Sequence, residues 1–124
     1  MGAGRKILVV EDEPVVALSI KYTLQQWKFD AGVVASGEEA LEYVAREQPD
    51  VLLMDIRLKG SLDGVDTATQ LSAGTYRPVI FLTAFADSEM VERIKNIPGY
   101  AGYLTKPFDN AELKAMIDRA LKKK

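Results

Sequence analysis

The alternation of short apolar runs with amphipathic stretches limits the possible folds of this chain more than any other feature of its sequence. The runs are continuously apolar, which is typical of strands that are buried on both faces of a parallel sheet. The stretches between them have helical spacing of their apolar residues. The pattern predicts five strands, over residues 7–10, 31–35, 51–54, 79–82 and 103–105.

Helix signals fill the intervals between these runs. Pro14 suits the first turn of a helix after the first strand, because its missing N–H has no partner there in any case. Ser36 and Glu39 have the spacing of a capping box, which predicts the start of a second helix. Further helices are expected over residues 65–73, around residues 90–94 with a stop near Pro98, and over residues 109–121.

Strict alternation of five strands and five helices predicts an α/β fold with one parallel sheet, right-handed crossovers and helices on both faces. The expected architecture is flavodoxin-like, (βα)5, with strand order 2-1-3-4-5. The chain has 124 residues, which is the size of one domain, so we expect a single domain over residues 1–124 with a core of about residues 6–121.

Polar side chains stand where four of the apolar runs end. They are Glu11 and Asp12 after the first run, Asp55 after the third, Thr83 after the fourth and Lys106 after the fifth. In open parallel sheets the functional crevice lies beyond the carboxyl ends of the strands, at the point where the strand order reverses. The sequence therefore predicts one pocket that gathers three carboxylates, a hydroxyl and an ammonium.

The chain contains no histidine and no cysteine. Disulfides, thiolate metal sites, imidazole ligands and Ser-His or Cys-His nucleophiles are therefore excluded. A metal ion would have to be held by oxygen atoms, which favours a hard cation such as Mg²⁺, or Mn²⁺. Asp12 and Asp55 are the expected direct ligands, and the longer Glu11 could act through a water molecule.

Such a site could carry out phosphoryl chemistry. Once a cation and Lys106 neutralise the carboxylates, an oxygen of Asp55 can attack a phosphoryl group. Lys106 and the Thr83 hydroxyl would then stabilise the charge on the transferring oxygens. Each residue taken singly has a commoner structural interpretation as a turn former, helix cap or surface charge. Their coincidence at one sheet edge favours the functional interpretation.

The charge distribution argues against nucleic-acid and membrane binding. The formal net charge is −2, and the only basic run, residues 122–124, is interpreted as a solvated helix end. No stretch has the length of a membrane span, and residues 1–6 are too short and polar for a signal peptide. A soluble cytoplasmic protein is the resulting expectation.

Five stretches together resemble one known family. They are residues 7–14 (ILVVEDEP), 53–56 (LMDI), 63–64 (DG), 81–84 (FLTA) and 103–108 (YLTKPF). In their order and spacing, the chain is similar to receiver domains of two-component response regulators. The similarity extends from about Lys6 to about Leu121. The loop over residues 57–64 resembles that of receivers associated with sensory histidine kinases.

This resemblance implies a phosphoryl-accepting switch. Asp55 would receive its phosphoryl group, in a Mg²⁺-dependent reaction, from a phosphohistidine of a histidine kinase or a histidine phosphotransfer protein. Glu11 and Asp12 would correspond to the acidic metal-binding pair of the family. The backbone carbonyl of Arg57 would supply a third protein ligand. Lys106 would contact the phosphoryl group, and its bond to Pro107 is expected to be cis.

The resemblance also implies how the signal is transmitted. Thr83 would move toward the phosphoryl group and let the ring of Tyr103 turn inward. This movement would reshape the face formed by the fourth helix, the fifth strand and the fifth helix. Such a protein is not a conventional enzyme, but it catalyses its own aspartyl phosphorylation and dephosphorylation.

Alternative functions remain open at this point. The main one is an interaction module of the same fold that works without phosphorylation. A hydrolase with an aspartyl-phosphate intermediate is less favoured, because no cap domain is expected. A flavodoxin-like cofactor binder is disfavoured by the absence of a glycine-rich loop after the first strand. The sequence leaves open the cognate kinase, the output partner, the phosphoryl lifetime, the oligomeric state and whether the chain is part of a larger protein.

Overall fold

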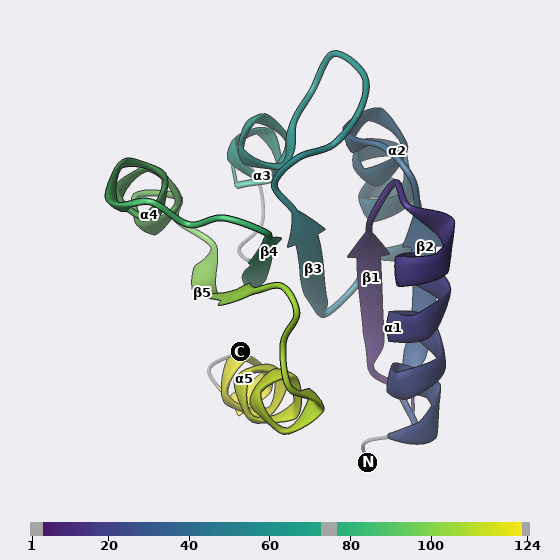
Figure 1. Ribbon diagram of the computed structural model, residues 1–124. Coiled ribbons are helices and arrows are strands. Elements are labelled where there is room, and N and C mark those ends of the chain that lie inside the picture. Colours follow the sequence, from purple (N-terminus) through teal and green to yellow (C-terminus); the bar gives the residue numbers. More distant parts are fainter. Residues whose placement is uncertain (1–3, 73–76, 123–124) are drawn as a thin grey trace.

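A five-stranded parallel sheet with the strand order β2-β1-β3-β4-β5 organises the chain, as predicted (Figure 1). The computed structural model describes residues 4–72 and 77–122. The elements are β1 (Lys6–Val10), α1 (Pro14–Gln26), β2 (Asp30–Val34), α2 (Gly37–Glu47), β3 (Val51–Asp55), α3 (Gly64–Leu71), β4 (Val79–Thr83), α4 (Ser88–Lys95), β5 (Tyr100–Thr105) and α5 (Asn110–Lys122). The flavodoxin-like prediction is confirmed.

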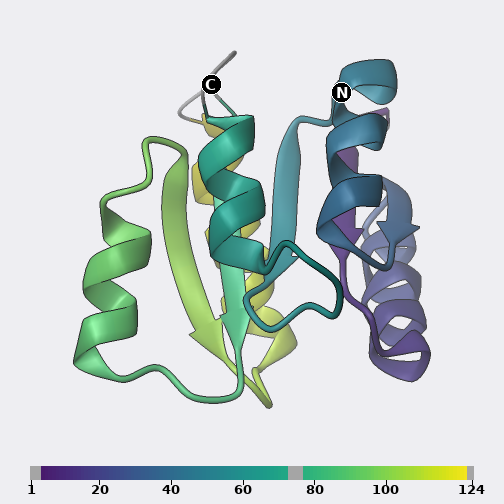
Figure 2. The same ribbon diagram turned by 90° about the horizontal axis from the view of Figure 1, so that it is seen from above.

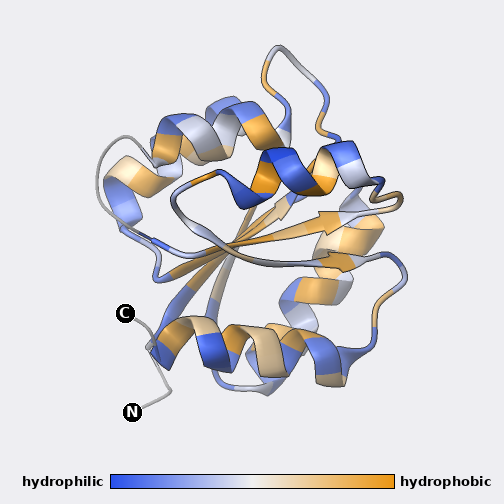
Figure 3. Ribbon diagram, turned by 90° about the vertical axis from the view of Figure 1, so that its left-hand side faces the viewer, coloured by the Kyte–Doolittle hydropathy of each residue, from blue (hydrophilic) through white to orange (hydrophobic). Residues whose placement is uncertain are grey.

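The helices form two layers on opposite faces of the sheet. Figure 2 shows α2, α3 and α4 in front of the strands, with α1 and α5 behind them. The strands between the layers are strongly hydrophobic in Figure 3, which agrees with their continuous apolar runs. Among the described residues, none of the helices combines the length and the apolarity needed to span a bilayer.

Two separate cores result from the alternation of side chains along each strand. Leu8, Leu52 and Phe81 face the core under α2, α3 and α4. Ile7 and Leu53, from neighbouring positions, face the core under α1 and α5. All of these side chains are fully buried. The continuous apolar runs are thus explained by burial on both faces.

A helix cap follows directly after the end of β2. The Ser36 hydroxyl accepts a hydrogen bond from the Glu39 N–H at 3.1 Å, and Glu39 Oε1 accepts one from the Ala35 N–H at 2.7 Å. The predicted Ser36 cap is therefore present, but Glu39 accepts from the N–H of Ala35 rather than from that of Ser36, so the reciprocal half of the predicted capping box is shifted by one residue. This shift also explains why β2 ends at Val34 rather than at the predicted residue 35, because the backbone of Ala35 takes part in the cap.

The bounds of the third helix and of the fifth strand also differ from the prediction. The third helix begins at Gly64 and ends at Leu71, with Ser72 as its C-cap, and the predicted end at residue 73 lies outside the described residues. The fifth strand begins at Tyr100 instead of residue 103. A bulge allows the longer strand, because Val79 pairs with Tyr100 and Ile80 already pairs with Gly102. A φ of +141° at Gly102 suits glycine.

The ends of the chain lie only partly within the described residues. Residues 1–3 lie outside them, as do residues 123 and 124 of the basic run. Lys122 is the last residue of α5, in agreement with the interpretation of this run as a helix end, and the other two lysines of the run lie outside the described residues.

Candidate functional site

The predicted site residues lie at the carboxyl edge of the sheet. Asp55 and Thr83 are the last residues of β3 and β4, and Glu11 follows directly after β1. Lys106 follows directly after β5. Because β1 and β3 are neighbours and both end at this edge, residues that are far apart in sequence can meet there.

Lys106 joins two of the carboxylates. Its Nζ lies 2.8 Å from Glu11 Oε1 and 3.2 Å from Asp55 Oδ2. Glu11 is 1% exposed and Asp55 is 6% exposed, so both acids are buried beside this single ammonium. One lysine thus compensates a pair of buried carboxylates, and the net charge of the three groups stays negative when all are ionised.

Backbone N–H groups orient the remaining oxygen atoms of these two acids. Asp55 Oδ1 accepts a hydrogen bond from the Arg57 N–H at 3.1 Å. Glu11 Oε2 accepts one from the Glu13 N–H at 3.2 Å. With Lys106 on one oxygen and an amide on the other, the orientation of each carboxylate is defined.

Burial, followed by the negative charge of Glu11, raises the pKa of Asp55 from its ordinary 3.8 to about 6, although Lys106 acts in the opposite direction. Burial lowers the pKa of Lys106, but its bonds and charge interactions with Glu11 and Asp55 prevail and hold that pKa above the ordinary value. Lys106 therefore stays charged, whereas Asp55 is an acid whose ionised form is disfavoured until further positive charge is available.

Asp12 completes a group of three acids that could hold a metal ion. One carboxylate oxygen from each of Glu11, Asp12 and Asp55 lies within 4.8 Å of the others, among the described residues. Asp12 is the half-buried member, and its Oδ2 accepts a hydrogen bond from the Lys59 N–H at 3.1 Å. An oxygen-only donor set with excess negative charge fits a hard divalent cation such as Mg²⁺.

Thr83 stands at the same edge, but its hydroxyl is engaged elsewhere. The hydroxyl donates to the Phe85 carbonyl oxygen at 2.9 Å and accepts from the Phe85 N–H at 3.2 Å. A buried hydroxyl needs partners, and the backbone after β4 provides both of them. The edge position of Thr83 agrees with the prediction, and the direction of its hydrogen bonds could not be read from the sequence.

Tyr103 lies on β5 and is half-buried against the core under α2, α3 and α4. The Lys106–Pro107 peptide bond is cis, as the family resemblance implies. The role of the Arg57 carbonyl as a metal ligand stays a prediction, since the contact that Arg57 makes here is through its N–H.

Sequence reasoning missed the backbone donors of Glu13 and Lys59. Any residue except proline carries an N–H group, so no residue type marks these positions. The positive φ of +102° at Gly60, next to Lys59, reflects a turn that the glycine alone could have suggested.

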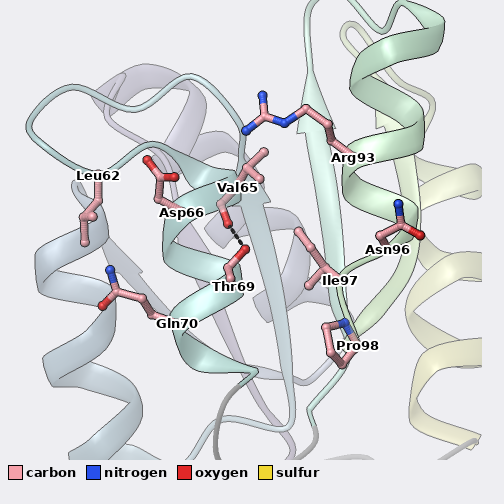
Figure 4. A pocket seen from close by; sticks show the side chains of 9 residues that line it. All are labelled: Leu62, Val65, Asp66, Thr69, Gln70, Arg93, Asn96, Ile97 and Pro98. Atoms are coloured by element: carbon pink, nitrogen blue, oxygen red, sulfur yellow. Dashed lines mark hydrogen bonds between the residues drawn. The ribbon is translucent and has the colours of Figure 1, made fainter.

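An open groove between α3 and α4 is separate from this site (Figure 4). Val65 and Ile97 contribute apolar side chains, whereas Asp66 and Arg93 contribute opposite charges. None of the three clustered acids lines this groove. The chemistry predicted from the sequence therefore belongs to the carboxyl edge and not to this groove.

Comparisons with known proteins identify related chains. Residues 7–118 match the response regulator receiver domain. The transcriptional regulatory protein PdtaR of Mycobacterium tuberculosis is 30% identical over 118 residues, which are 94% of this chain and 57% of PdtaR. The chain thus spans little more than half the length of this curated relative.

Two solved structures are similar over nearly their whole length. One is the signal receiver domain of a modulated diguanylate cyclase from Desulfovibrio desulfuricans, with a TM-score of 0.87 and 39% identity over 95% of this chain and 94% of that chain. The other is the receiver domain of the sensor histidine kinase PA1611 from Pseudomonas aeruginosa, which has a magnesium ion coordinated in its active-site cleft. Its TM-score is 0.86, with 35% identity over 97% of this chain and 99% of that chain.

Proposed function

The chain belongs to the response regulator receiver domain family, and on this premise we propose that it is a signalling switch that accepts a phosphoryl group on Asp55. The observation that carries the proposal is the contact of Lys106 with both buried acids, at 2.8 Å from Glu11 and 3.2 Å from Asp55. Asp12 lies beside them in the same cluster. This arrangement combines a nucleophile (Asp55), a positive charge that the protein itself supplies (Lys106) and a set of oxygen donors for a metal ion.

A divalent cation, Mg²⁺ or Mn²⁺, would be held by Asp12 and Asp55, with Glu11 close by. When bound, it would supply positive charge that favours the ionised form of Asp55 and balances the phosphoryl oxygens. The magnesium ion in the related Pseudomonas aeruginosa receiver supports this assignment. The Arg57 carbonyl is a further proposed ligand.

The transfer step uses a carboxylate oxygen of Asp55 as the nucleophile. This oxygen forms a new bond to phosphorus while the bond between phosphorus and the donor imidazole nitrogen breaks, and the electron pair stays with the imidazole. The donor is a histidine kinase or a histidine phosphotransfer protein. Lys106 is already within hydrogen-bond distance of Asp55 and stabilises the charge on the transferring oxygens.

The readout follows from the present hydrogen bonds of Thr83. Its single hydroxyl hydrogen can be donated to a new phosphoryl oxygen only if Thr83 gives up the bond that it donates to the Phe85 carbonyl oxygen. Release of Phe85 would free the loop between β4 and α4, and movement of Thr83 would let Tyr103 repack. The phosphoryl group then selects between two arrangements through its different contacts in each.

Intact-mass spectrometry tests the proposal. Acetyl phosphate with Mg²⁺ should add one base-labile phosphoryl group to the wild-type chain and none to Asp55→Asn. Asp118→Asn, at a half-buried position on α5, is the matched control and should be modified like the wild type. A folded wild-type chain that stays unmodified with several donors, while another receiver is modified in parallel, would contradict the proposal and favour an interaction module.

We further propose that the donor protein docks along α1. Four large apolar side chains are strongly exposed among the described residues: Val15, Leu18, Tyr22 and Phe85. The first three have helical spacing on α1, and they are 81%, 63% and 64% exposed. Because α1 begins just after Asp12, a helix packed on this stripe could bring its phosphohistidine to Asp55.

Leu18→Asp should separate docking from chemistry. Transfer from a cognate phosphohistidine protein should fall at least about tenfold, because a charge would be buried in an apolar contact. Modification by acetyl phosphate should be unchanged, since this small donor needs no docking surface. Gln26→Asp, near the far end of α1, is the control. Equal loss with both donors would indicate damage to the site and contradict the docking proposal.

A further inference from the structure

We infer that Ser61 and Glu38 are positioning residues for Asp12, and that they act through the backbone N–H of Lys59. The inference rests on the proposed function, because it takes Asp12 as a metal ligand. The segment concerned is the loop over residues 56–63, between β3 and α3. Figures 1 and 2 show this loop lying beyond β3, between α3 and α2.

Two contacts attach this loop at different places. The Lys59 N–H donates to Asp12 Oδ2 at 3.1 Å, which links the loop to the metal-binding cluster. The Ser61 hydroxyl donates to Glu38 Oε2, which links the loop to the first turn of α2. Only Gly60 separates the two attached residues. The position of the Lys59 N–H is therefore coupled to the position of Ser61.

The backbone conformation of Gly60 sets how the two attached residues of the loop are placed relative to each other. Its φ of +102° turns the chain sharply between Lys59 and Ser61, a conformation that residues with a Cβ rarely adopt. A Cβ at this position would also lie 3.4 Å from Glu38 Oε1. The turn therefore brings the loop close to Glu38 while the preceding N–H stays directed at Asp12.

The hydrogen bond to Asp12 has a clear consequence for metal binding. A carboxylate that accepts an amide hydrogen bond on one oxygen has a restricted orientation, and its second oxygen remains available to a cation. Outer contacts of this kind orient metal ligands in proteins. The bond from Ser61 holds the loop that provides this amide, and it also lowers the pKa of Glu38 below its ordinary value.

Other contacts also hold the loop, and they limit how far the loss of the Ser61–Glu38 bond can loosen it. Leu58 is buried in the core, and Leu62 packs closely against the first residue of α2, Gly37. The stretch between these anchors, residues 59–61, is exposed. Among the described residues, two hydrogen bonds to side chains hold this stretch: the one from the Lys59 N–H to Asp12 and the one from Ser61 to Glu38. Ser61→Ala or Glu38→Ala removes the second of them. Its loss should loosen the stretch without unfolding the domain.

Titration of the full chain with Mg²⁺ tests the inference, with the Kd obtained from backbone amide NMR shifts at Asp12 and Asp55. Ser61→Ala and Glu38→Ala should each weaken Mg²⁺ binding about threefold to tenfold, below the range seen when a direct outer partner is removed. The double variant should be no weaker than either single variant, because both remove the same bond. Hydrogen exchange of the Lys59 amide in metal-free protein should become faster.

Two further variants separate the effect of the Ser61–Glu38 hydrogen bond from that of the negative charge of Glu38. Glu38→Gln keeps an oxygen that can accept the Ser61 hydroxyl, so it should bind Mg²⁺ like the wild type. Glu42→Ala removes an exposed glutamate one turn further along α2 and should also leave the Kd unchanged. If Glu38→Gln or Glu42→Ala weakens binding as much as Glu38→Ala, long-range charge is the cause and the inference is wrong.

The outcomes distinguish this inference from the proposed function. A wild-type chain that binds Mg²⁺, with Ser61→Ala and Glu38→Ala binding it equally well, overturns the positioning role alone. Additive effects in the double variant do the same, because they show two independent causes. A folded wild-type chain that fails to bind Mg²⁺ overturns both the metal assignment and this inference.

Discussion

Asp55 illustrates how its surroundings can prepare a single side chain for chemistry. Burial and the neighbouring Glu11 raise its pKa to about 6, while Lys106 and the Arg57 N–H favour its ionised form. The ionised form of this carboxylate is therefore disfavoured in the folded chain, and added positive charge would lower its free energy. Such perturbed acids are typical of functional sites.

This perturbation predicts a pH-dependent gain in stability for Asp55→Asn. The pKa is raised above the ordinary 3.8, so Asp55 favours folding when protonated, and this contribution is lost as pH rises through about 6. At pH 7.5 the neutral variant should have a free energy of unfolding about 1–2 kcal/mol higher, less than the full shift implies because solvent screens this open edge. At pH 4 the difference should nearly vanish.

Urea denaturation at both pH values measures this effect. Asp118→Asn, which removes only a surface ion pair with Lys114 on the same helix, should differ little from the wild type at either pH. An Asp55→Asn variant that is less stable than the wild type at pH 7.5 would show that the ion pair with Lys106 outweighs burial and repulsion.

At the scale of elements, the start of α3 determines how closely a helix can approach the end of β3. A Cβ at Gly64 would lie 2.1 Å from the carbonyl oxygen of Asp55, and backbone atoms cannot rotate away as side chains do. The Gly64 N–H also donates to the Ile56 carbonyl oxygen at 2.8 Å. Asp63 caps the same helix by accepting from the Asp66 N–H at 2.8 Å. The end of β3 and the start of α3 therefore form one tightly packed unit.

Gly64→Ala should disturb this unit. We expect a loss of about 2–3 kcal/mol in the free energy of unfolding, because overpacking against backbone forces the helix away from the strand. Modification of Asp55 by acetyl phosphate should slow as well, since its backbone must shift. Urea denaturation and intact-mass time courses measure the two effects. Gln70→Ala, on the exposed face of α3, is the control, and a Gly64→Ala variant as stable as this control would refute the packing argument.

At the scale of the whole molecule, the sheet brings charged groups from the ends of three strands together at one edge. Asp55 is the last residue of β3. Glu11 directly follows β1, and Lys106 directly follows β5. A cation that binds this cluster only in the folded state must raise the free energy of unfolding. The same cation must compete with protons for Asp55.

Mg²⁺ should therefore raise the melting temperature in a pH-dependent way. At one hundred times its Kd, Mg²⁺ should add about 2.7 kcal/mol of stability at pH 7.5. At pH 5, below the pKa of about 6, Asp55 is mostly protonated and the shift in melting temperature should be smaller. Differential scanning calorimetry with and without Mg²⁺ measures both shifts. Equal shifts at the two pH values, or the same shift in Asp55→Asn, would exclude Asp55 as a ligand.

Several features of this molecule can be predicted from patterns within short stretches of its sequence. The apolar runs predicted strands buried on both faces, and β1, β3 and β4 are confirmed as such. Ser36 and Glu39 predicted a helix start that is present. Asp55 and Lys106 were expected at one sheet edge, because parallel strands place their carboxyl ends together, and they lie 3.2 Å apart.

Other features depend on contacts between distant segments, and tertiary structure alone decided them. The pKa of Asp55 reflects its burial and a charge 44 positions away in sequence, at Glu11. The amide that orients Asp12 belongs to Lys59, and a backbone N–H has no residue type to reveal it. The Thr83 hydroxyl could have faced the cluster or the loop, and its bonds to Phe85 depend on how that loop packs. Residue types and their spacing determined which groups this edge of the sheet contains, whereas their orientation and charge state required the assembled fold, because both depend on distances and burial.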